Sequence, residues 1–195
     1  MRNRWARQWV RSARQLAVSA EARQDALYEW RRRRSGEPPL PDATIRRVLV
    51  VCHGNICRSP FAAALISRRR RDVEVRSAGL AAGEGAAIHE GALRAARSFG
   101  VDLGRHRAQL LEEGDVSWAE LILAMEGHQA AQVAKRWPSS APRIRLLGDF
   151  LPGPPFRIGD PFGQSDAVFT AAFERIEFAV EQLIGRLEAA GAGPA

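Results

Sequence analysis

The sequence predicts an α/β fold in which a four-stranded parallel sheet carries helices on both faces. Short apolar runs alternate with longer stretches of helical periodicity, and one run passes through a glycine-containing loop into a helix start. The apolar runs predict strands at 46–52, 73–77, 119–125 and 143–147. The helical patterns predict helices at 59–71, 87–99, 126–136 and 166–189.

The first 44 residues have the pattern of a basic helical extension with a linker. Residues 2–34 have no internal Pro or Gly, and their apolar side chains recur at steps near three and four: Trp5, Trp9, Ala13, Leu16, Ala20, Leu27 and Trp30. The segment 35–41, Ser-Gly-Glu-Pro-Pro-Leu-Pro, ends this helix. Residues 1–44 hold ten arginines and five acidic residues, a net charge of +5, whereas the other 151 residues hold 19 basic and 17 acidic groups, a net of +2.

Each later element has a local signal. The β-branched run at 48–51 indicates a buried strand, and the four arginines at 68–71 suit the end of the helix that follows, where cations complement the dipole. One apolar stripe traces the last helix: Val168, Phe169, Ala172, Ile176, Ala179, Val180, Leu183 and Leu187. We therefore expect one domain over 45–190, followed by a Gly/Ala tail at 191–195.

Composition narrows the class of protein. The 195 residues, 46% hydrophobic, suit one domain of about 150 residues with an appendage. No run approaches the ~20 apolar residues of a membrane span, and the N-terminus lacks the apolar region of a secretory signal. The two cysteines do not make a disulfide framework. These features predict a cytoplasmic protein.

The segment 48–60, Val-Leu-Val-Val-Cys-His-Gly-Asn-Ile-Cys-Arg-Ser-Pro, holds the most informative chemistry. A strand that enters a tight loop and then a helix binds anions, because loop N–H groups and the helix dipole attract negative charge. Cys52 at the base of this loop is favoured as a thiolate nucleophile, and the planar fork of Arg58 can hold two oxygens of a tetrahedral anion. The pattern predicts hydrolysis of a phosphate ester through a cysteinyl phosphate. The alternative, a buried structural Cys52, leaves the other loop residues unexplained.

This segment resembles the signature Cys-x-Gly-Asn-x-Cys-Arg-Ser-Pro of the low-molecular-weight protein tyrosine phosphatases. The resemblance covers about residues 45–190, with further landmarks at 75–79, 106–108, 121–125 and 160–163. It implies a Rossmann-like three-layer sandwich that binds its ligand at the carboxyl ends of the strands, where Cys52 lies. It also implies a phosphotyrosine phosphatase that needs no cofactor.

A departing phenoxide needs a proton donor, for which Asp160 is the candidate. Pro161 biases Asp160 toward an extended loop conformation. From composition alone Asp160-Pro161 is a turn, but the resemblance places the general acid there, able to protonate the leaving oxygen and then to activate water. The resemblance also matches Phe162 to an aromatic residue that flanks the substrate ring.

The resemblance assigns the remaining site residues to a phosphate-binding loop and its support. The loop comprises His53, Gly54, Asn55, Ile56, Cys57 and Ser59. Ser59 can donate to the Cys52 sulfur, while Ser77 and His106 would brace Asn55 and Ser59. Cys57 has two open roles, packing or resolving an oxidised Cys52 as a disulfide.

We expect no metal site, because the chain's other histidines have no carboxylate or cysteine at ligand spacing: His53, His89 and His128.

Three alternatives compete with a tyrosine phosphatase. An arsenate reductase of the thioredoxin-linked kind needs cysteines after Cys57, and there are none. In arginine phosphatases of this fold the residue before the second cysteine tends to be threonine, whereas Ile56 suits an aryl ester. A phosphoprotein-binding adaptor would not need the predicted catalytic residues.

The resemblance suggests a phosphotyrosine protein as substrate, such as a bacterial tyrosine autokinase that controls exopolysaccharide synthesis. Residues 1–34 have three interpretations: a helix packed on the domain, an anchor to an anionic membrane surface, or a contact for a protein partner. Specific nucleic-acid binding has no support. We expect a chain lacking residues 1–40 to keep most of its kcat on a small aryl phosphate and to bind anionic vesicles less. An insoluble or inactive truncated chain would show that the helix is part of the fold.

Overall fold

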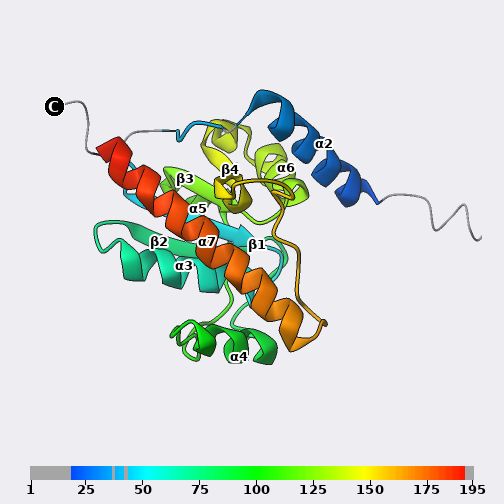
Figure 1. Cartoon of the computed structure of the whole chain (residues 1–195), viewed down its shortest axis with the longest axis vertical. Helices are drawn as coiled ribbons and strands as arrows, with labels where there is room; N and C mark the ends of the chain where they lie inside the picture. Colours follow the sequence, from blue (N-terminus) through cyan, green and yellow to red (C-terminus); the bar gives the residue numbers. More distant parts are fainter. Residues whose placement is uncertain (1–18, 37, 42–43, 192–195) are drawn as a thin grey trace, which may run out of the picture.

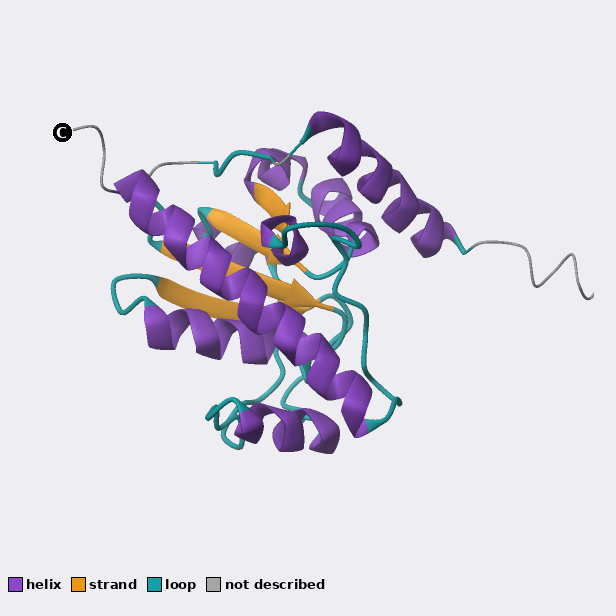
Figure 2. Cartoon of the chain, in the orientation of Figure 1, coloured by secondary structure: helices purple, strands orange, loops and turns teal. Residues whose placement is uncertain are grey.

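A parallel sheet forms the centre of the computed structural model, which describes residues 19–36, 38–41 and 44–191 (Figures 1 and 2). Its four strands are β1 (Arg47–Cys52), β2 (Glu74–Gly79), β3 (Leu121–Ala124) and β4 (Ile144–Leu146). They pair in the order β2-β1-β3-β4, and every pair is parallel. Strand β1 is flanked on both sides and buried over 48–52, as its β-branched run predicts.

Helices cover both faces of this sheet, which confirms the three-layer sandwich (Figure 1). The helices are α3 (Arg58–Arg69), α4 (Glu90–Ser98), α5 (Glu113–Trp118), α6 (Gly127–Arg136) and α7 (Asp166–Gly191). The larger core lies between the sheet and α3 and α7, with α4 packed against α7. The smaller core joins the opposite face to α5 and α6. Two short 3₁₀ helices flank β4, η1 (Pro138–Arg143) and η2 (Leu147–Phe150).

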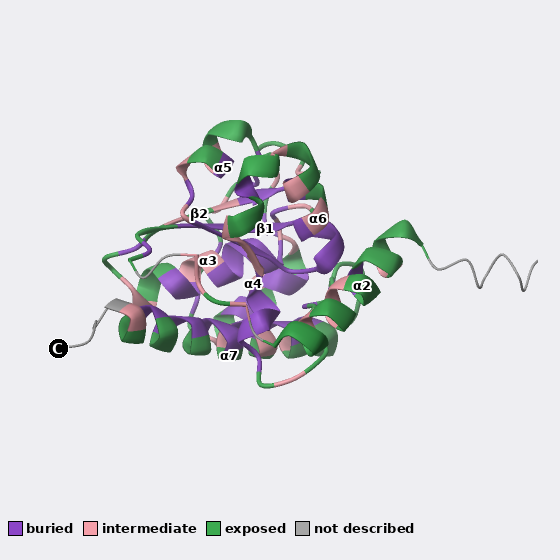
Figure 3. Ribbon diagram, turned by 90° about the horizontal axis from the view of Figure 1, so that it is seen from above, coloured by how far each residue is buried: buried purple, intermediate pink, exposed green. Residues whose placement is uncertain are grey.

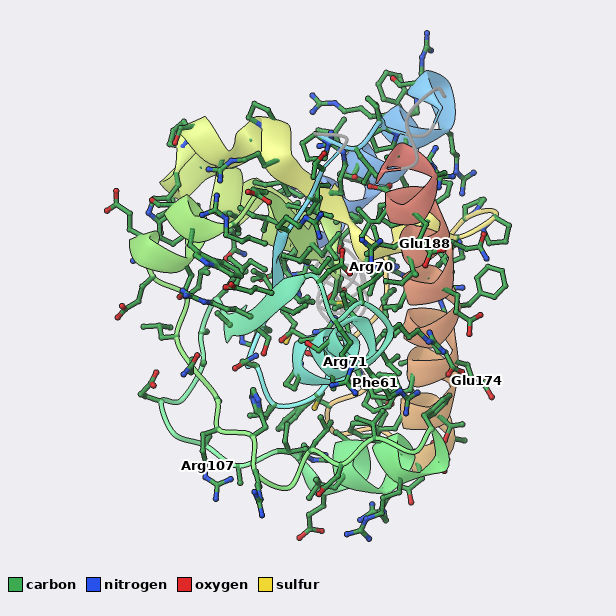
Figure 4. All side chains as sticks on the ribbon, turned by 90° about the vertical axis from the view of Figure 1, so that its left-hand side faces the viewer. Phe61, Arg70, Arg71, Arg107, Glu174 and Glu188 are labelled. Carbon is green, nitrogen blue, oxygen red and sulfur yellow. The ribbon has the colours of Figure 1, made fainter. Side chains whose placement is uncertain are left out.

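The long helix α7 is held by its apolar stripe. Phe169, Phe173, Ile176, Val180 and Leu183 are each at most 1% exposed, and burying a side chain of this size contributes about 1.5–3 kcal/mol. The opposite side of α7 faces solvent (Figure 3). Phe61 of α3, which Figure 4 labels between α3 and α7, stacks on Phe173 with ring centroids 4.0 Å apart. This packing fixes α3, and with it the loop that precedes α3.

The first described helix, α2 (Ala20–Ser35), packs against α6 on the outside of the sandwich (Figures 1 and 3). The side chain of Ser19 caps it by accepting a hydrogen bond from the Ala22 N–H at 3.0 Å. Its contact with the domain includes hydrogen bonds of the buried Asp25 and the half-buried Tyr28, Glu29 and Arg32. Tyr28 also packs against an apolar cluster of the domain.

Over α2, the members of the predicted apolar stripe are exposed: Ala20, Leu27 and Trp30. Leu27 is 46% and Trp30 is 55% exposed, so neither is buried by the domain, although Leu27 lines a pocket together with residues of α6. The other stripe members outside α2, Trp5, Trp9, Ala13 and Leu16, lie outside the described residues. Hydrogen bonds to buried backbone groups, which periodicity does not register, decide which face of α2 is covered. Within the described ranges, no helix combines the length and the apolar character that a bilayer crossing requires.

Candidate active site

Cys52 lies at the carboxyl end of β1, where the loop 53–57 crosses the edge of the sheet. Its register partner on β2 is Gly79. A Cβ on Gly79 would lie 2.8 Å from the His53 carbonyl oxygen and 2.9 Å from the Asn55 nitrogen, so only glycine lets the loop pass this closely. The Ala81 N–H donates to the His53 carbonyl at 2.9 Å and holds the loop to the chain after β2.

Two donors face the sulfur of Cys52, which is buried. The Asn55 N–H lies 3.3 Å from Sγ, and the Ser59 hydroxyl lies 3.0 Å from it. Ser59 Oγ also accepts a hydrogen bond from Asn55 Nδ2 at 3.0 Å, so its own proton is left for the sulfur. Both contacts stabilise a negative charge on Sγ, as expected for a thiolate nucleophile.

Asn55 connects the loop to the surrounding strands. Its φ of 53° lies in the left-handed region, which asparagine tolerates better than most residues. Its Nδ2 donates to Ser77 Oγ at 3.0 Å, and its Oδ1 accepts from the Gln109 N–H at 3.0 Å. His106 Nε2 lies 2.9 Å from the Asn55 carbonyl, so this nitrogen carries the proton. Burial lowers the pKa of His106, and its bond to Asn55 opposes that effect.

Arg58 is the first residue of α3 and is 1% exposed. Its Nη1 donates to Glu126 Oε2 at 2.6 Å and to the Ile158 carbonyl at 2.9 Å, while its Nη2 lies 2.7 Å from Asp160 Oδ2. Burial by itself lowers the pKa of the guanidinium. The charges of Cys52, Asp160 and Glu126 outweigh burial, so the pKa is raised above its ordinary value. Arg58 Nε is buried and has no hydrogen-bond partner among the described residues.

Asp160 and Phe162 close one side of the pocket above the loop. The Asp160 side chain is 40% exposed, and its Oδ1 accepts from the Phe162 N–H at 3.2 Å. The Phe162 ring meets the edge of the His89 ring at 5.1 Å, and His89 in turn stacks on Phe169 of α7 at 5.1 Å. His89 thus ties the exposed Phe162 to the core.

The pocket encloses about 350 Å³, enough for a phosphate group with an aromatic ring. Eight of the predicted site residues line it: Cys52, His53, Gly54, Ile56, Cys57, Arg58, Asp160 and Phe162. Three small residues form the rest of the lining: Ala81, Gly83 and Ala86. The other predicted residues lie in the supporting network around Asn55. The structure therefore brings every predicted site residue to one place.

Cys57 precedes α3 and is buried as a free thiol. Burial, followed by the negative charges of Asp160 and Cys52, raises the pKa of the Cys57 thiol to about 12. At neutral pH Cys57 is therefore a thiol and packs in the larger core.

Sequence reasoning missed Glu126, His89 and Gly79. Glu126 could have been found, because it is the first charged residue after β3, and β3 neighbours β1 at the same sheet edge. The close approach at Gly79 and the ring contacts of His89 depend on tertiary packing, although Gly79 lies within a family landmark.

The expectation of no metal site rests on spacing along the chain, which does not register the neighbours of His128 in the fold. Its ring lies with Asp25 and Glu126 in a group whose potential ligand atoms are all within 4.8 Å of one another. Asp25 is 103 positions away, so spacing along the chain could not reveal it. These atoms are engaged within the protein: Asp25 accepts from the His128 N–H, and Glu126 binds the Arg58 guanidinium, whose charge opposes a cation.

Comparison with known proteins gives a consistent result. Residues 47–192 match the sequence family described as low molecular weight phosphotyrosine protein phosphatase. The chain is 37% identical over 147 residues to the probable low molecular weight protein-tyrosine-phosphatase EpsP of Ralstonia nicotianae, covering 75% of this chain and 99% of that protein. The YwlE arginine phosphatase from Geobacillus stearothermophilus superposes with a TM-score of 0.69 and 34% identity, over 74% of this chain and 94% of that chain. The tyrosine phosphatase Wzb from Escherichia coli K30, in complex with sulphate, superposes with a TM-score of 0.71 and 29% identity, over 74% of this chain and 99% of that chain.

Proposed function

Because this chain belongs to the low molecular weight phosphotyrosine protein phosphatase family, we propose that it hydrolyses phosphotyrosine in proteins through a phosphorylated Cys52. The observation that supports this most is the shared pocket of Cys52 and Arg58, with Asp160 2.7 Å from the guanidinium. Nucleophile, anion-binding group and proton donor thus meet within one small site.

In the first step the Cys52 thiolate attacks phosphorus. The S–P bond forms as the P–O bond to the tyrosyl oxygen breaks, and Asp160 in its acid form gives its proton to that oxygen. Arg58 holds two phosphoryl oxygens through Nε, which has no partner among the described residues, and Nη2. Glu126 and the Ile158 carbonyl fix Nη1, so the planar fork is oriented before substrate arrives.

In the second step water attacks the phosphorus of phosphorylated Cys52. The Asp160 carboxylate takes the proton from this water, the S–P bond breaks, and inorganic phosphate leaves. The electron pair returns to Cys52 Sγ, where the Ser59 hydroxyl and the Asn55 N–H stabilise the departing thiolate. Both steps use groups of the chain itself.

Substrate preference follows from the walls of the pocket. Ile56 and Phe162 offer apolar surface to a phenyl ring, and neither side chain can accept a hydrogen bond from a guanidinium. We therefore favour phosphotyrosine over phosphoarginine, with Ile56 as the distinguishing residue. Phosphoarginine remains the second candidate, because the arginine phosphatase from Geobacillus is 34% identical to this chain.

The test compares kcat/KM for peptides that differ only in carrying phosphotyrosine, phosphoarginine or phosphoserine. We expect phosphotyrosine to be the best substrate, no turnover by Cys52→Ser, and unchanged activity with a chelator present. Ile56→Thr should shift the preference toward phosphoarginine. A wild-type preference for phosphoarginine would support the second candidate, and full activity of Cys52→Ser would exclude the covalent mechanism.

For the partners, a bacterial tyrosine kinase suits a pocket that takes phosphotyrosine.

We also propose that the N-terminal residues 1–34 bind an anionic membrane surface. Residues 1–18 hold five arginines and no acidic residue, and the exposed Leu27 and Trp30 of α2 add apolar surface. A chain that lacks residues 1–18 should bind less to vesicles with anionic lipids than the full chain does. Equal binding would favour a protein partner.

A further inference from the structure

Helix α2 reaches the segment that carries the proposed general acid. The Glu29 carboxylate accepts hydrogen bonds through Oε1 from the Phe156 N–H at 2.5 Å and from the Arg157 N–H at 3.1 Å. Arg32, one helical turn further, stacks its guanidinium over the Phe156 ring at 4.5 Å from the centroid. Its Nε also lies 3.1 Å from a carboxylate oxygen of Asp149. An element outside the matched family region thus holds the backbone just before Asp160.

From these two N–H groups the chain runs directly into the active site. Ile158 follows Arg157, donates to the Met125 carbonyl at 2.8 Å, and accepts from Arg58 Nη1 at 2.9 Å. Asp160 is only two residues further and contacts Arg58 Nη2. A displacement of the backbone at 156–157 would therefore move Asp160 relative to the phosphate-binding groups.

A second contact of α2 holds the start of α6, the helix that Glu126 precedes. Asp25 Oδ1 accepts from the His128 N–H at 2.8 Å, in the first turn of α6. Glu126, the N-cap residue of α6, makes no side-chain capping bond there, since its carboxylate binds Arg58. Asp25 thus supplies the cap that Glu126 does not, and α2 supports both segments that contact the guanidinium.

We propose that α2 is a positioning element for catalysis, with Glu29 as the positioning residue that keeps Asp160 within reach of the leaving oxygen. This inference rests on the proposed function, because it assigns Glu29 a role through the general acid. Without the Glu29 acceptor, two backbone N–H groups lose their partner, and that of the buried Phe156 is costly to leave unpaired. The segment 156–160 would then shift, and proton donation would suffer before phosphate binding does.

The test uses two substrates that differ in their need for an acid. Phenyl phosphate has a poor leaving group that must be protonated, whereas dinitrophenyl phosphate releases a stable anion without a proton. In Glu29→Ala we expect kcat/KM for phenyl phosphate to fall roughly tenfold, and that for dinitrophenyl phosphate by less than about twofold. Glu29→Gln keeps an oxygen acceptor, so it should retain activity within about threefold on both substrates.

The control is Glu21→Ala, an exposed position in the first turn of α2 at which the same change should leave both values unaltered. Equal losses on the two substrates in Glu29→Ala would assign α2 a purely structural role and overturn the proposal, as would unchanged activity. Hydrolysis of aryl phosphates by the wild-type chain tests the proposed function separately. If it hydrolyses aryl phosphates and Glu29→Ala behaves like wild type, only the positioning role is wrong.

Discussion

Arg58 shows how a single residue of this site serves several partners. Its Nη1 is held by Glu126 and Ile158, whereas its Nη2 contacts Asp160, the proposed acid. A phosphate that binds Nε and Nη2 therefore competes with the Asp160 carboxylate for the same positive charge. Binding and proton transfer are coupled at this guanidinium.

Asp160→Ala should separate these two effects. We expect kcat/KM for phenyl phosphate to fall by roughly 10²–10⁴, because the proton donor is lost. Inorganic phosphate should inhibit this variant more strongly than wild type, because the competing carboxylate is gone. The measurement is competitive inhibition by phosphate, with dinitrophenyl phosphate as the reporter. Weaker inhibition would show that Asp160 does not compete for Arg58.

A second prediction concerns the resolving role of Cys57. In this role, we expect peroxide to oxidise the Cys52 thiolate to a sulfenic acid, from which the Cys57 thiolate displaces hydroxide to form the disulfide. Because the pKa of Cys57 is raised to about 12, its thiolate fraction grows about tenfold per pH unit across the neutral range. Disulfide formation after a peroxide pulse should therefore be slow at neutral pH and faster in alkali, as measured by alkylation and mass spectrometry.

Cys57→Ser is the control for this prediction. It should lose activity irreversibly as oxidation of Cys52 proceeds, whereas wild type should recover with a thiol reductant. If the variant recovers as fully as wild type, Cys57 has only a packing role.

At the scale of elements, the capping of α6 by Asp25 gives a stability prediction. Asp25→Ala removes a buried acceptor from the first turn of α6 and should lower the free energy of unfolding by about 0.5–2 kcal/mol. Asp25→Asn keeps a side-chain oxygen and should lose less. Urea denaturation of both variants measures the difference. Equal stability of Asp25→Ala and wild type would mean that this hydrogen bond has no net effect.

The elements that periodicity predicts are those with long apolar patterns. All four strands, and the helices now labelled α3, α4, α6 and α7, appear at the expected places with ends shifted by a few residues. Helix α5 has only six residues, and the 3₁₀ helices have six and four, too short to show a helical period. The sequence left open whether the N-terminal helix packs on the domain, and the hydrogen bonds by which Asp25 and Glu29 hold α2 there have no periodic signal.

The same distinction holds for the site. The loop residues, Ser59 and Arg58 are contiguous in sequence, and Asp160 precedes a proline, so a motif could identify them. Glu126, His89 and Glu29 act from other elements, 68, 31 and 29 positions from Arg58. The roles of His89 and Glu29 follow only from how the sheet edge and the helices come together, whereas the place of Glu126 directly after β3 gives a weak signal in the sequence.

At the scale of the whole molecule, the N-terminal region has two parts: residues 1–18 hold its net positive charge, and α2 packs on the domain. Residues 19–44 hold five arginines and five acidic residues, so the net charge of +5 over residues 1–44 comes from the five arginines of residues 1–18. The predicted domain boundary at residue 44 places α2 outside the domain. In the structure α2 packs on α6 and contacts the segment 156–157 that precedes Asp160. A chain without residues 1–40 loses Glu29, so we now expect its turnover of phenyl phosphate to fall. Removal of residues 1–18 alone should leave turnover unchanged.

The central claim is that the phosphoryl group passes through Cys52. The most direct measurement uses Asp160→Ala with dinitrophenyl phosphate, whose leaving group needs no acid, while hydrolysis of the intermediate still needs a base. Rapid quenching followed by peptide mass spectrometry should find one phosphoryl group on the peptide that contains Cys52, together with a burst of dinitrophenol. The same experiment with Cys52→Ser should show neither. Steady turnover without a phosphorylated Cys52, or a phosphoryl group on another residue, would contradict the account.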